Sequence, residues 1–185
     1  MDELFADAGN RMEKAVEAVR REFAKIRTGK ATVSLLDGVK VEYYGSTAPL
    51  RQVANISVPE ARLLVVQPWD KKITGDIEKA IRSADLGLNP SSDGNLIRVP
   101  IPALTEERRK EMVRYVHKLA EEGRVAIRNV RRDVNEALKK KHKDGDISED
   151  DFHRARDKTV QELTDKHIHE IDHVLAAKET ELMEV

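Results

Sequence analysis

The sequence contains no cysteine, and that absence excludes whole classes of protein. A chain without cysteine has neither a disulfide framework nor a thiol nucleophile, and it suits a reducing compartment. No hydrophobic run is long enough to cross a membrane, and residues 1–7 are acidic, with no basic region followed by an apolar run. We therefore expect no signal or transit peptide, no membrane partner and a cytoplasmic location.

Aromatic residues are also scarce, at 4%, whereas charged residues make up 36% of the chain. Such a composition suits either a disordered chain or long amphipathic helices with narrow apolar seams. The hydrophobic fraction of 39% and its clear periodicity favour helices. The formal net charge is only −1, so attraction to an anionic partner requires basic residues to be gathered locally.

Proline is absent from both ends of the chain, since all six prolines lie between residues 49 and 102. In the flanking segments apolar residues recur every three or four positions, which is the spacing of an amphipathic helix. The pattern predicts helices over residues 2–27, about 105–143 and about 148–184, with a break at the sequence Asp-Gly-Asp of residues 144–146. Each apolar stripe needs helical partners, because a single stripe cannot bury itself.

In the middle of the chain the spacing of apolar residues is different. Short alternating or β-rich runs, typical of strands, cover residues 39–43, 53–58, 63–66 and 96–101. Between them, residues 73–84 carry apolar side chains on one helical face. We expect a turn at Pro59-Glu60, and we expect the strand end at Pro100 to lie at an edge of the sheet.

Together these segments predict an α+β fold: an elongated three-helix bundle with a small inserted β/α/β domain, in an L-shaped or rod-like molecule. Residues 1–29 and 105–185 form the discontinuous bundle, and residues 31–103 form the inserted domain. Two short linkers, near residues 28–31 and 103–105, join the domain to one end of the bundle and act as a hinge. The predicted hinge residues are Thr28, Gly29, Lys30, Ala103, Leu104 and Thr105. Antiparallel helices would place residue 131 level with the start of the first helix, far from the hinge.

The second helix carries four arginines within nine residues: Arg124, Arg128, Arg131 and Arg132. At about 100° per residue they form a row beside the apolar stripe of Ile127, Val130 and Val134. Fixed guanidinium groups suit phosphates, so the row is a candidate RNA-binding surface. The alternative is a solvated helix face whose arginines pair with Glu121, Asp133 and Glu136.

Other basic residues lie near the helix ends. Arg109 and Lys110 fall in the first turn of the second helix, where cations oppose the helix dipole, so a phosphate partner is a reasonable interpretation. Arg27 ends the first helix and is a further RNA-binding candidate. The cations of residues 139–143 fall in the last turns of a helix, where positive charge is expected without any ligand.

Residues 169–173, His-Glu-Ile-Asp-His, match the H-E-x-x-H pattern of zinc peptidases. His169 and His173 share a helix face, but that face points away from Ile171 and the seam, toward solvent. Catalytic zinc also needs a third protein ligand and a closed cleft. Adventitious zinc or nickel binding is a better interpretation than catalysis. We therefore expect no metal site, no cofactor and no enzymatic activity.

Several ordered segments resemble the bacterial ribosome recycling factor family over the whole length of the chain. They are residues 25–31 (KIRTGKA), 41–45 (VEYYG), 85–90 (DLGLNP), 105–110 (TEERRK), 128–132 (RNVRR) and 178–182 (KETEL). At Lys30 the family more often has arginine, and lysine keeps the charge but loses the bidentate geometry.

The resemblance implies a three-helix bundle with an inserted β/α/β domain, which agrees with the fold expected from periodicity. It implies a monomeric, non-enzymatic translation factor that binds the post-termination ribosome and, with the GTPase elongation factor G, promotes its dissociation into subunits for reuse. The implied main contact is large-subunit ribosomal RNA through Arg132, with Arg128 beside it. Two other classes stay open, a coiled-coil-like protein-binding adaptor and, more remotely, a zinc metallopeptidase using His169 and His173.

Overall fold

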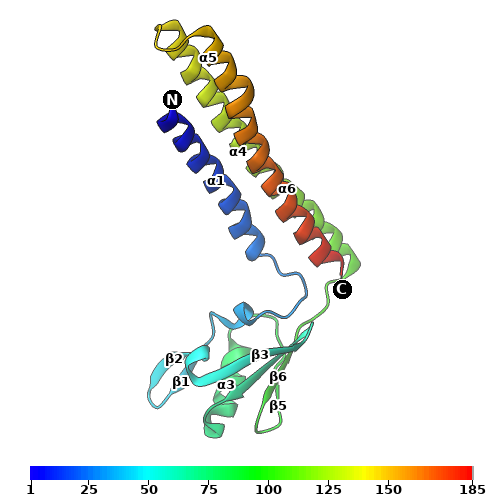
Figure 1. Cartoon of the computed structure of the whole chain (residues 1–185). Coiled ribbons are helices and arrows are strands. Elements are labelled where there is room, and N and C mark those ends of the chain that lie inside the picture. Colours follow the sequence, from blue (N-terminus) through cyan, green and yellow to red (C-terminus); the bar gives the residue numbers. More distant parts are fainter. Residues whose placement is uncertain (185) are drawn as a thin grey trace. The chain divides into compact units, whose positions relative to one another are not determined.

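The computed structural model describes residues 1–184 and divides them into two compact units. One unit comprises residues 1–27 and 106–184 and is helical, whereas residues 28–105 combine short helices with strands (Figure 1). The predicted mixed class, a long helical bundle with a small β domain, is confirmed. None of the helices within residues 1–184 combines the length and the apolar character that crossing a bilayer requires.

Three long helices build the helical unit, and each contacts the other two: α1 (Asp2–Ala24), α4 (Glu106–Lys143) and α6 (Gln161–Met183). Two shorter segments lead directly into α6: α5 (Glu149–Arg154) and η3 (Ala155–Val160), which is π-helical. The first helix ends at Ala24, three residues before the predicted end at Arg27. The π-helical turn has no counterpart in the sequence prediction.

The connection between α4 and α5 forms as the sequence predicts. Gly145 has a φ of 82°, a left-handed conformation that suits glycine after a helix. Ser148 then caps α5, because its Oγ accepts a hydrogen bond from the backbone N–H of Asp151 at 3.1 Å. The short turn reverses the chain and lets α6 return along α4.

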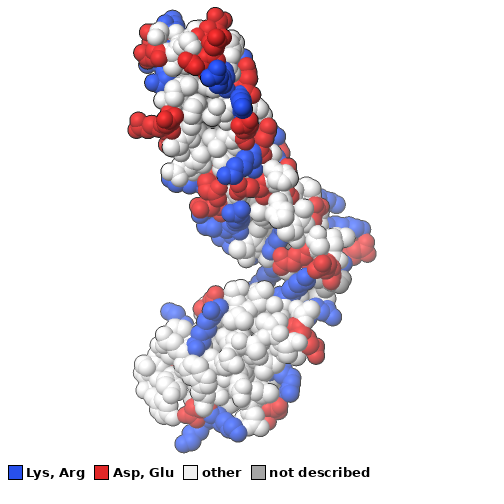
Figure 2. Space-filling model, in the orientation of Figure 1, with Lys and Arg blue, Asp and Glu red and all other residues white. Residues whose placement is uncertain are grey.

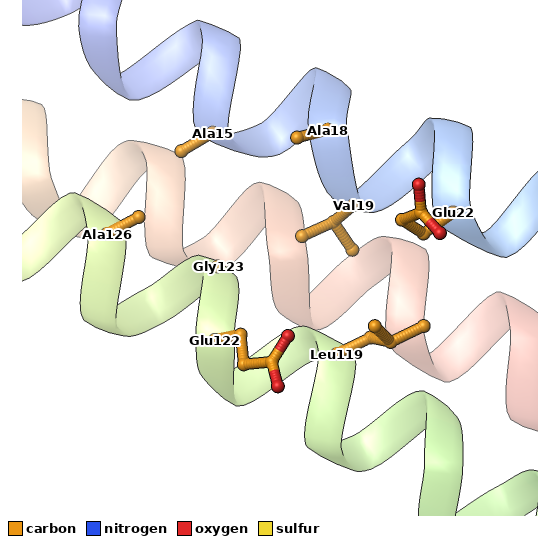
Figure 3. A pocket seen from close by; sticks show the side chains of 8 residues that line it. All are labelled: Ala15, Ala18, Val19, Glu22, Leu119, Glu122, Gly123 and Ala126. Carbon is orange, nitrogen blue, oxygen red and sulfur yellow. The ribbon is translucent and has the colours of Figure 1, made fainter.

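The apolar stripes predicted for the three helices form the core of the helical unit. The stripe of α4 is buried at Val116, Ala120, Gly123, Ile127, Val130, Val134 and Leu138. Gly123 lies where all three helices meet: a Cβ added to it would lie 2.5 Å from Val19 Cγ2 on α1 and 2.9 Å from Ile171 Cδ1 on α6. Figure 3 shows the Val19 side chain directed from α1 toward α4, where it and Gly123 are among the residues that line a pocket. The absence of a side chain at this position permits the close approach.

The register of α1 against α4 differs from the prediction. Arg11 Nη2 donates to Asp133 Oδ2 at 2.5 Å, so residue 133 lies beside residue 11. The expectation that residue 131 would be level with the start of α1 is therefore wrong. That expectation assumed that the end of α1 lies level with the start of α4. In the structure α1 already ends at Ala24, which leaves a longer connection after it.

The α/β unit contains an antiparallel four-stranded sheet of order β3-β4-β6-β5. Its strands are β3 (Ala54–Glu60), β4 (Leu63–Pro68), β5 (Ser91–Ser92) and β6 (Ile97–Pro100). The helix α3 (Thr74–Ser83) contributes Ile77 and Ile81 to the same core as the buried strand residues Leu64 and Val66. Strand β5 pairs with β6 only at Ile97 and Arg98. The side of β6 that faces β5 is therefore unpaired at Pro100, and this end of the strand is an edge, as predicted.

Two features of this unit differ from the sequence prediction. Strand β1 (Lys40–Tyr43) pairs with a second strand, β2 (Ser46–Pro49), and both residues of the connecting turn, Tyr44 and Gly45, have positive φ. Pro59 and Glu60 lie within β3, not in a turn. The strand tolerates the proline because β3 is an edge strand with an irregular register between Ser57 and Glu60. Short helical turns complete the unit: η1 (Val33–Leu36), α2 (Leu50–Val53) and η2 (Lys71–Ile73).

The contact at Gly123 leads to a first prediction. Replacing Gly123 by alanine gains helix propensity of about 1 kcal/mol, but the added methyl overlaps the buried side chains of Val19 and Ile171. Overpacking of this kind costs about 1–3 kcal/mol, so we expect a net decrease in the free energy of unfolding measured by urea denaturation.

Gly9→Ala is the matched control, because a Cβ there would lie 3.7 Å from Leu163 Cδ1, an ordinary contact. We expect Gly9→Ala to be neutral or stabilising. If both alanine variants stabilised the protein equally, the close approach at Gly123 would not limit the packing of the bundle.

Candidate nucleic-acid interface

The arginine row occupies one side of α4, at the border of its buried stripe. Ile127, Val130 and Val134 are buried in the bundle, which fixes the rotation of α4 about its axis. Arg128 and Arg132 are exposed as a result, and Arg124 and Arg131 are half-buried. The four guanidinium groups therefore share a helix side but differ in their surroundings.

Arg124 is an interhelical residue. Its side chain is only 19% exposed, and it donates from Nε (2.9 Å) and Nη2 (2.6 Å) to Oδ1 of Asp172 on α6. It also donates from Nη1 to Glu121 Oε2 at 3.1 Å. Burial alone would lower the pKa of Arg124, but the hydrogen bonds to Asp172 and Glu121 outweigh burial and raise it. The charge of Arg124 is thus compensated by acidic groups of α4 and α6.

Arg128 is partly compensated. Its Nη1 donates to Glu121 Oε1 at 2.8 Å, so one carboxylate serves both Arg128 and Arg124. The hydrogen bonds from Arg128 and then Arg124 lower the pKa of Glu121, which remains charged at neutral pH. The Arg128 side chain is 44% exposed. An ion pair this exposed contributes little to the stability of the fold, so Arg128 can exchange Glu121 for another anion.

Arg131 and Arg132 form no ion pair within residues 1–184. Asp133, which the sequence offers as a partner, is bound by Arg11 of α1. Arg132 Nη2 donates at 2.6 Å to Asn129 Oδ1, a neutral acceptor that orients the guanidinium without cancelling its charge. The structure thus separates the row into a compensated half, Arg124 and Arg128, and an uncompensated half, Arg131 and Arg132.

The other basic candidates lie elsewhere. Lys110 is exposed and pairs with Glu106 at 2.7 Å, one turn away. Arg109 is half-buried, and its Nε is a buried nitrogen without a hydrogen-bond partner among the described residues. Arg27 is exposed, at the end of the first segment of the helical unit. The structure does not bring these three residues together with the arginine row on α4.

The six predicted hinge residues belong to the α/β unit, where the two linkers lie side by side. Gly29 has a φ of 81°, and a Cβ on it would lie 3.5 Å from both Cγ and the backbone nitrogen of Leu104. Beyond the linkers, the N–H of Ala31 donates to the carbonyl of Ala61 and the N–H of Ile101 to that of Arg62. Both linkers therefore leave the unit next to the turn between β3 and β4.

The histidines of the H-E-x-x-H pattern, His169 and His173, are both exposed and Ile171 between them is buried, as predicted. A different histidine, His167, is buried one helical turn earlier. Sequence reasoning missed it because a histidine at a seam position gives no signal of its own.

Comparison with known proteins connects these features. The family profile described as "Ribosome recycling factor" matches residues 19–183. The chain belongs to the ribosome recycling factor family. The ribosome-recycling factor of Thioalkalivibrio sulfidiphilus is 59% identical to this chain over 184 residues, which cover 100% of this chain and 99% of the relative. The ribosome-recycling factor of Bacillus subtilis is 58% identical over 183 residues, which cover 99% of this chain and 98% of the relative.

Solved structures of ribosome recycling factors agree in fold. A solution structure of the ribosome recycling factor is 48% identical, with a TM-score of 0.73, and covers 100% of this chain and 97% of that one. A second match, at 47% identity, a TM-score of 0.63 and 98% coverage of both chains, is a T. thermophilus ribosome recycling factor presented with E. coli elongation factor G on the post-termination complex. The family and the function expected from the sequence, ribosome recycling, are thereby confirmed.

In this member of the ribosome recycling factor family, charge is distributed unevenly. Figure 2 shows basic and acidic side chains intermixed along the visible face of the helical unit, whereas the visible face of the α/β unit is mostly uncharged. Because the two signs alternate, the number of arginines does not identify a binding surface. Whether each arginine has an acidic partner shows better which of them can bind an anion.

Because Arg124 has acidic partners and Arg132 has none among the described residues, replacing each by alanine should change the stability of the protein by different amounts. Arg124→Ala removes an interhelical charge pair in which the arginine side chain is 19% exposed and that of Asp172 is 49% exposed, and hydrogen bonds to charged groups contribute about 1.5–3 kcal/mol. We expect Arg124→Ala to lower the free energy of unfolding by about 1–2 kcal/mol, whereas Arg132→Ala should change it by less than about 0.5 kcal/mol. Urea denaturation followed by circular dichroism measures both, and equal losses would contradict a structural role for Arg124.

Proposed function

We propose that this chain binds the post-termination ribosome through its helical unit and, together with elongation factor G, promotes dissociation of the ribosome into subunits. It does so in the cytoplasm, as a monomer and without catalysing a reaction of its own. Membership of the ribosome recycling factor family supports the overall role. The observation that carries the site assignment is the uncompensated charge of Arg131 and Arg132 among the described residues.

In this proposal Arg132 is the principal RNA anchor. Its guanidinium is exposed and oriented by Asn129, and it keeps several free donors for phosphate oxygens. Arg131 adds a second positive charge. Binding does not require either residue to break an ion pair, so neither pays that cost on approaching RNA.

Arg128 and Arg124 have lesser roles. Arg128 contacts RNA only by exchanging Glu121 for a phosphate, and its contribution to affinity is correspondingly smaller. Arg124 stabilises the contact between α4 and α6 and leaves the RNA contact to its neighbours. Arg109, Lys110 and Arg27 contribute positive charge away from the anchor.

The RNA-anchor proposal predicts a selective loss of affinity. Arg132→Ala should weaken binding to large ribosomal subunits by about tenfold or more, because a charge-assisted contact is worth about 1.5–3 kcal/mol. Arg132→Lys should recover only part of the loss, since lysine keeps the charge without the planar fork. Co-sedimentation with purified subunits measures the dissociation constants.

Arg21→Ala is the charge-matched control. It removes one exposed arginine from α1, where Arg21 pairs with Glu17, and it should leave affinity unchanged. If Arg132→Ala bound as tightly as the wild type, or no more weakly than Arg21→Ala, the anchor would lie elsewhere. Binding that did not respond to salt would favour a protein-binding adaptor instead.

We further propose that residues 28–30 and 103–105 form a hinge that lets the α/β unit move while the helical unit stays bound. The two linkers contact each other at Gly29 and Leu104, and both are anchored beside the β3–β4 turn. Neighbouring linkers define an axis of movement and restrict other movements, because a displacement of the unit must change backbone angles in both.

The hinge is tested by tying its two linkers together. The chain has no native cysteine, so a Gly29→Cys/Leu104→Cys variant carries only the engineered pair. A Cβ at residue 29 would lie 3.5 Å from Cγ of Leu104, so the two engineered side chains would be in contact. The oxidised protein should bind ribosomes but split them slowly, and reduction should restore splitting. The reduced form of the same variant controls for strain at Gly29. Equal splitting rates in the two forms would refute the hinge.

A further inference from the structure

A cluster of potential metal ligands lies outside the arginine row, between α1 and α6. It consists of Glu13 on α1 and of His167 and Glu170 on α6. One ligand atom from each of the three side chains lies within 4.8 Å of the other two. None of these residues has a part in the proposed RNA contact or in the hinge.

His167 is held in the orientation that metal-binding histidines adopt. The residue is 3% exposed, and its Nδ1 lies 2.7 Å from the carbonyl oxygen of Leu163, to which it donates. With the proton on Nδ1, the neutral ring carries its lone pair on Nε2, which faces the carboxylates. A histidine that donates its other ring N–H to a backbone carbonyl is the usual arrangement around a bound metal.

The distances suit a small cation. Nε2 of His167 lies 3.5 Å from Oε2 of Glu13. Ligands about 2.0–2.1 Å from a tetrahedral zinc ion are about 3.3–3.4 Å from one another, so this pair needs almost no rearrangement. Glu170 is one helical turn from His167 and only half-buried, which leaves its carboxylate free to rotate inward.

Arg20 brings a positive charge close to both carboxylates of the cluster. Its Nη1 lies 3.7 Å from Oε1 of Glu13 and its Nη2 lies 3.6 Å from Oε2 of Glu170. Both distances are longer than a hydrogen bond. Arg20 approaches Oε1 of Glu13, whereas the histidine faces Oε2, so the arginine does not occupy the space between His167 and Glu13. Its charge nevertheless opposes a cation.

We propose that Glu13, His167 and Glu170 form a binding site for a zinc-type divalent metal ion that joins α1 to α6. The imidazole and two carboxylates supply three ligands, and water completes the coordination. The site differs from the H-E-x-x-H pattern in the sequence, because it uses neither His169 nor His173 and takes one ligand from a different helix. Bound metal stabilises the bundle, since the unfolded chain does not bring the three ligands together.

Isothermal titration of the metal-free full-length protein with zinc chloride, together with thermal unfolding at increasing zinc concentration, tests the site. We expect one equivalent to bind and the melting temperature to rise. His167→Gln should weaken binding at least about tenfold and abolish the thermal shift. Arg20→Gln should tighten binding several-fold, because it removes a positive charge beside the metal.

The double variant His169→Gln/His173→Gln is the matched control, and it should keep both the affinity and the thermal shift. If instead that variant lost binding while His167→Gln retained it, the exposed histidines would be the only site and the proposal would be overturned. No binding to the wild type would overturn it too. Should circular dichroism show that His167→Gln does not fold, Glu170→Gln, at a half-buried position, replaces it in the same comparison.

Discussion

The contact of three helices at Gly123 is the constraint on which the helical unit depends. Only a residue without a side chain allows Val19 of α1 and Ile171 of α6 to approach α4 this closely. That contact sets the register of α4 against both neighbours, and the register decides which charges meet. Asp172 follows Ile171 directly and therefore meets Arg124, one residue beyond Gly123. Ten residues beyond Gly123 on α4, Asp133 meets Arg11.

These pairings decide the chemistry of the arginine row. Four arginines on one helix side form a nearly continuous positive stripe in sequence, but acidic partners compensate two of them. Arg124 and Arg128 share Glu121, and Arg124 also binds α6. Arg11 of α1 occupies the carboxylate that would otherwise compensate Arg131 or Arg132. Packing in the core thus determines, through the ion pairs around it, where positive charge remains available for phosphates.

Much of the fold could be predicted from the sequence because it depends on local periodicity. The three helices, the break at Gly145 and the cap at Ser148 all follow from spacing and turn chemistry. The sequence analysis missed strand β2, since residues 46–49 lack the apolar alternation of a strand. These residues pair with β1 because the turn at Tyr44 and Gly45 brings them beside it. The turn placed at Pro59 was wrong because an edge strand with an irregular register accepts proline.

The candidate site was harder to predict than the fold. The sequence identified the arginines but could not assign their partners, because Asp172 is 48 residues from Arg124 and Arg11 is 122 residues from Asp133. The same limitation concealed His167 and Glu13, whose proximity depends on the register of α1 against α6. Pairing across helices is a property of tertiary structure, and no local pattern encodes it.

The central claim is that Arg131 and Arg132 carry the charge that RNA neutralises. It is tested most directly by the salt dependence of binding to large ribosomal subunits. The logarithm of affinity should fall linearly with the logarithm of salt concentration, by about 0.7–0.9 per phosphate contact. For an Arg131→Ala/Arg132→Ala variant we predict a slope shallower by up to two such contacts. A variant with the affinity and salt slope of the wild type would contradict the account.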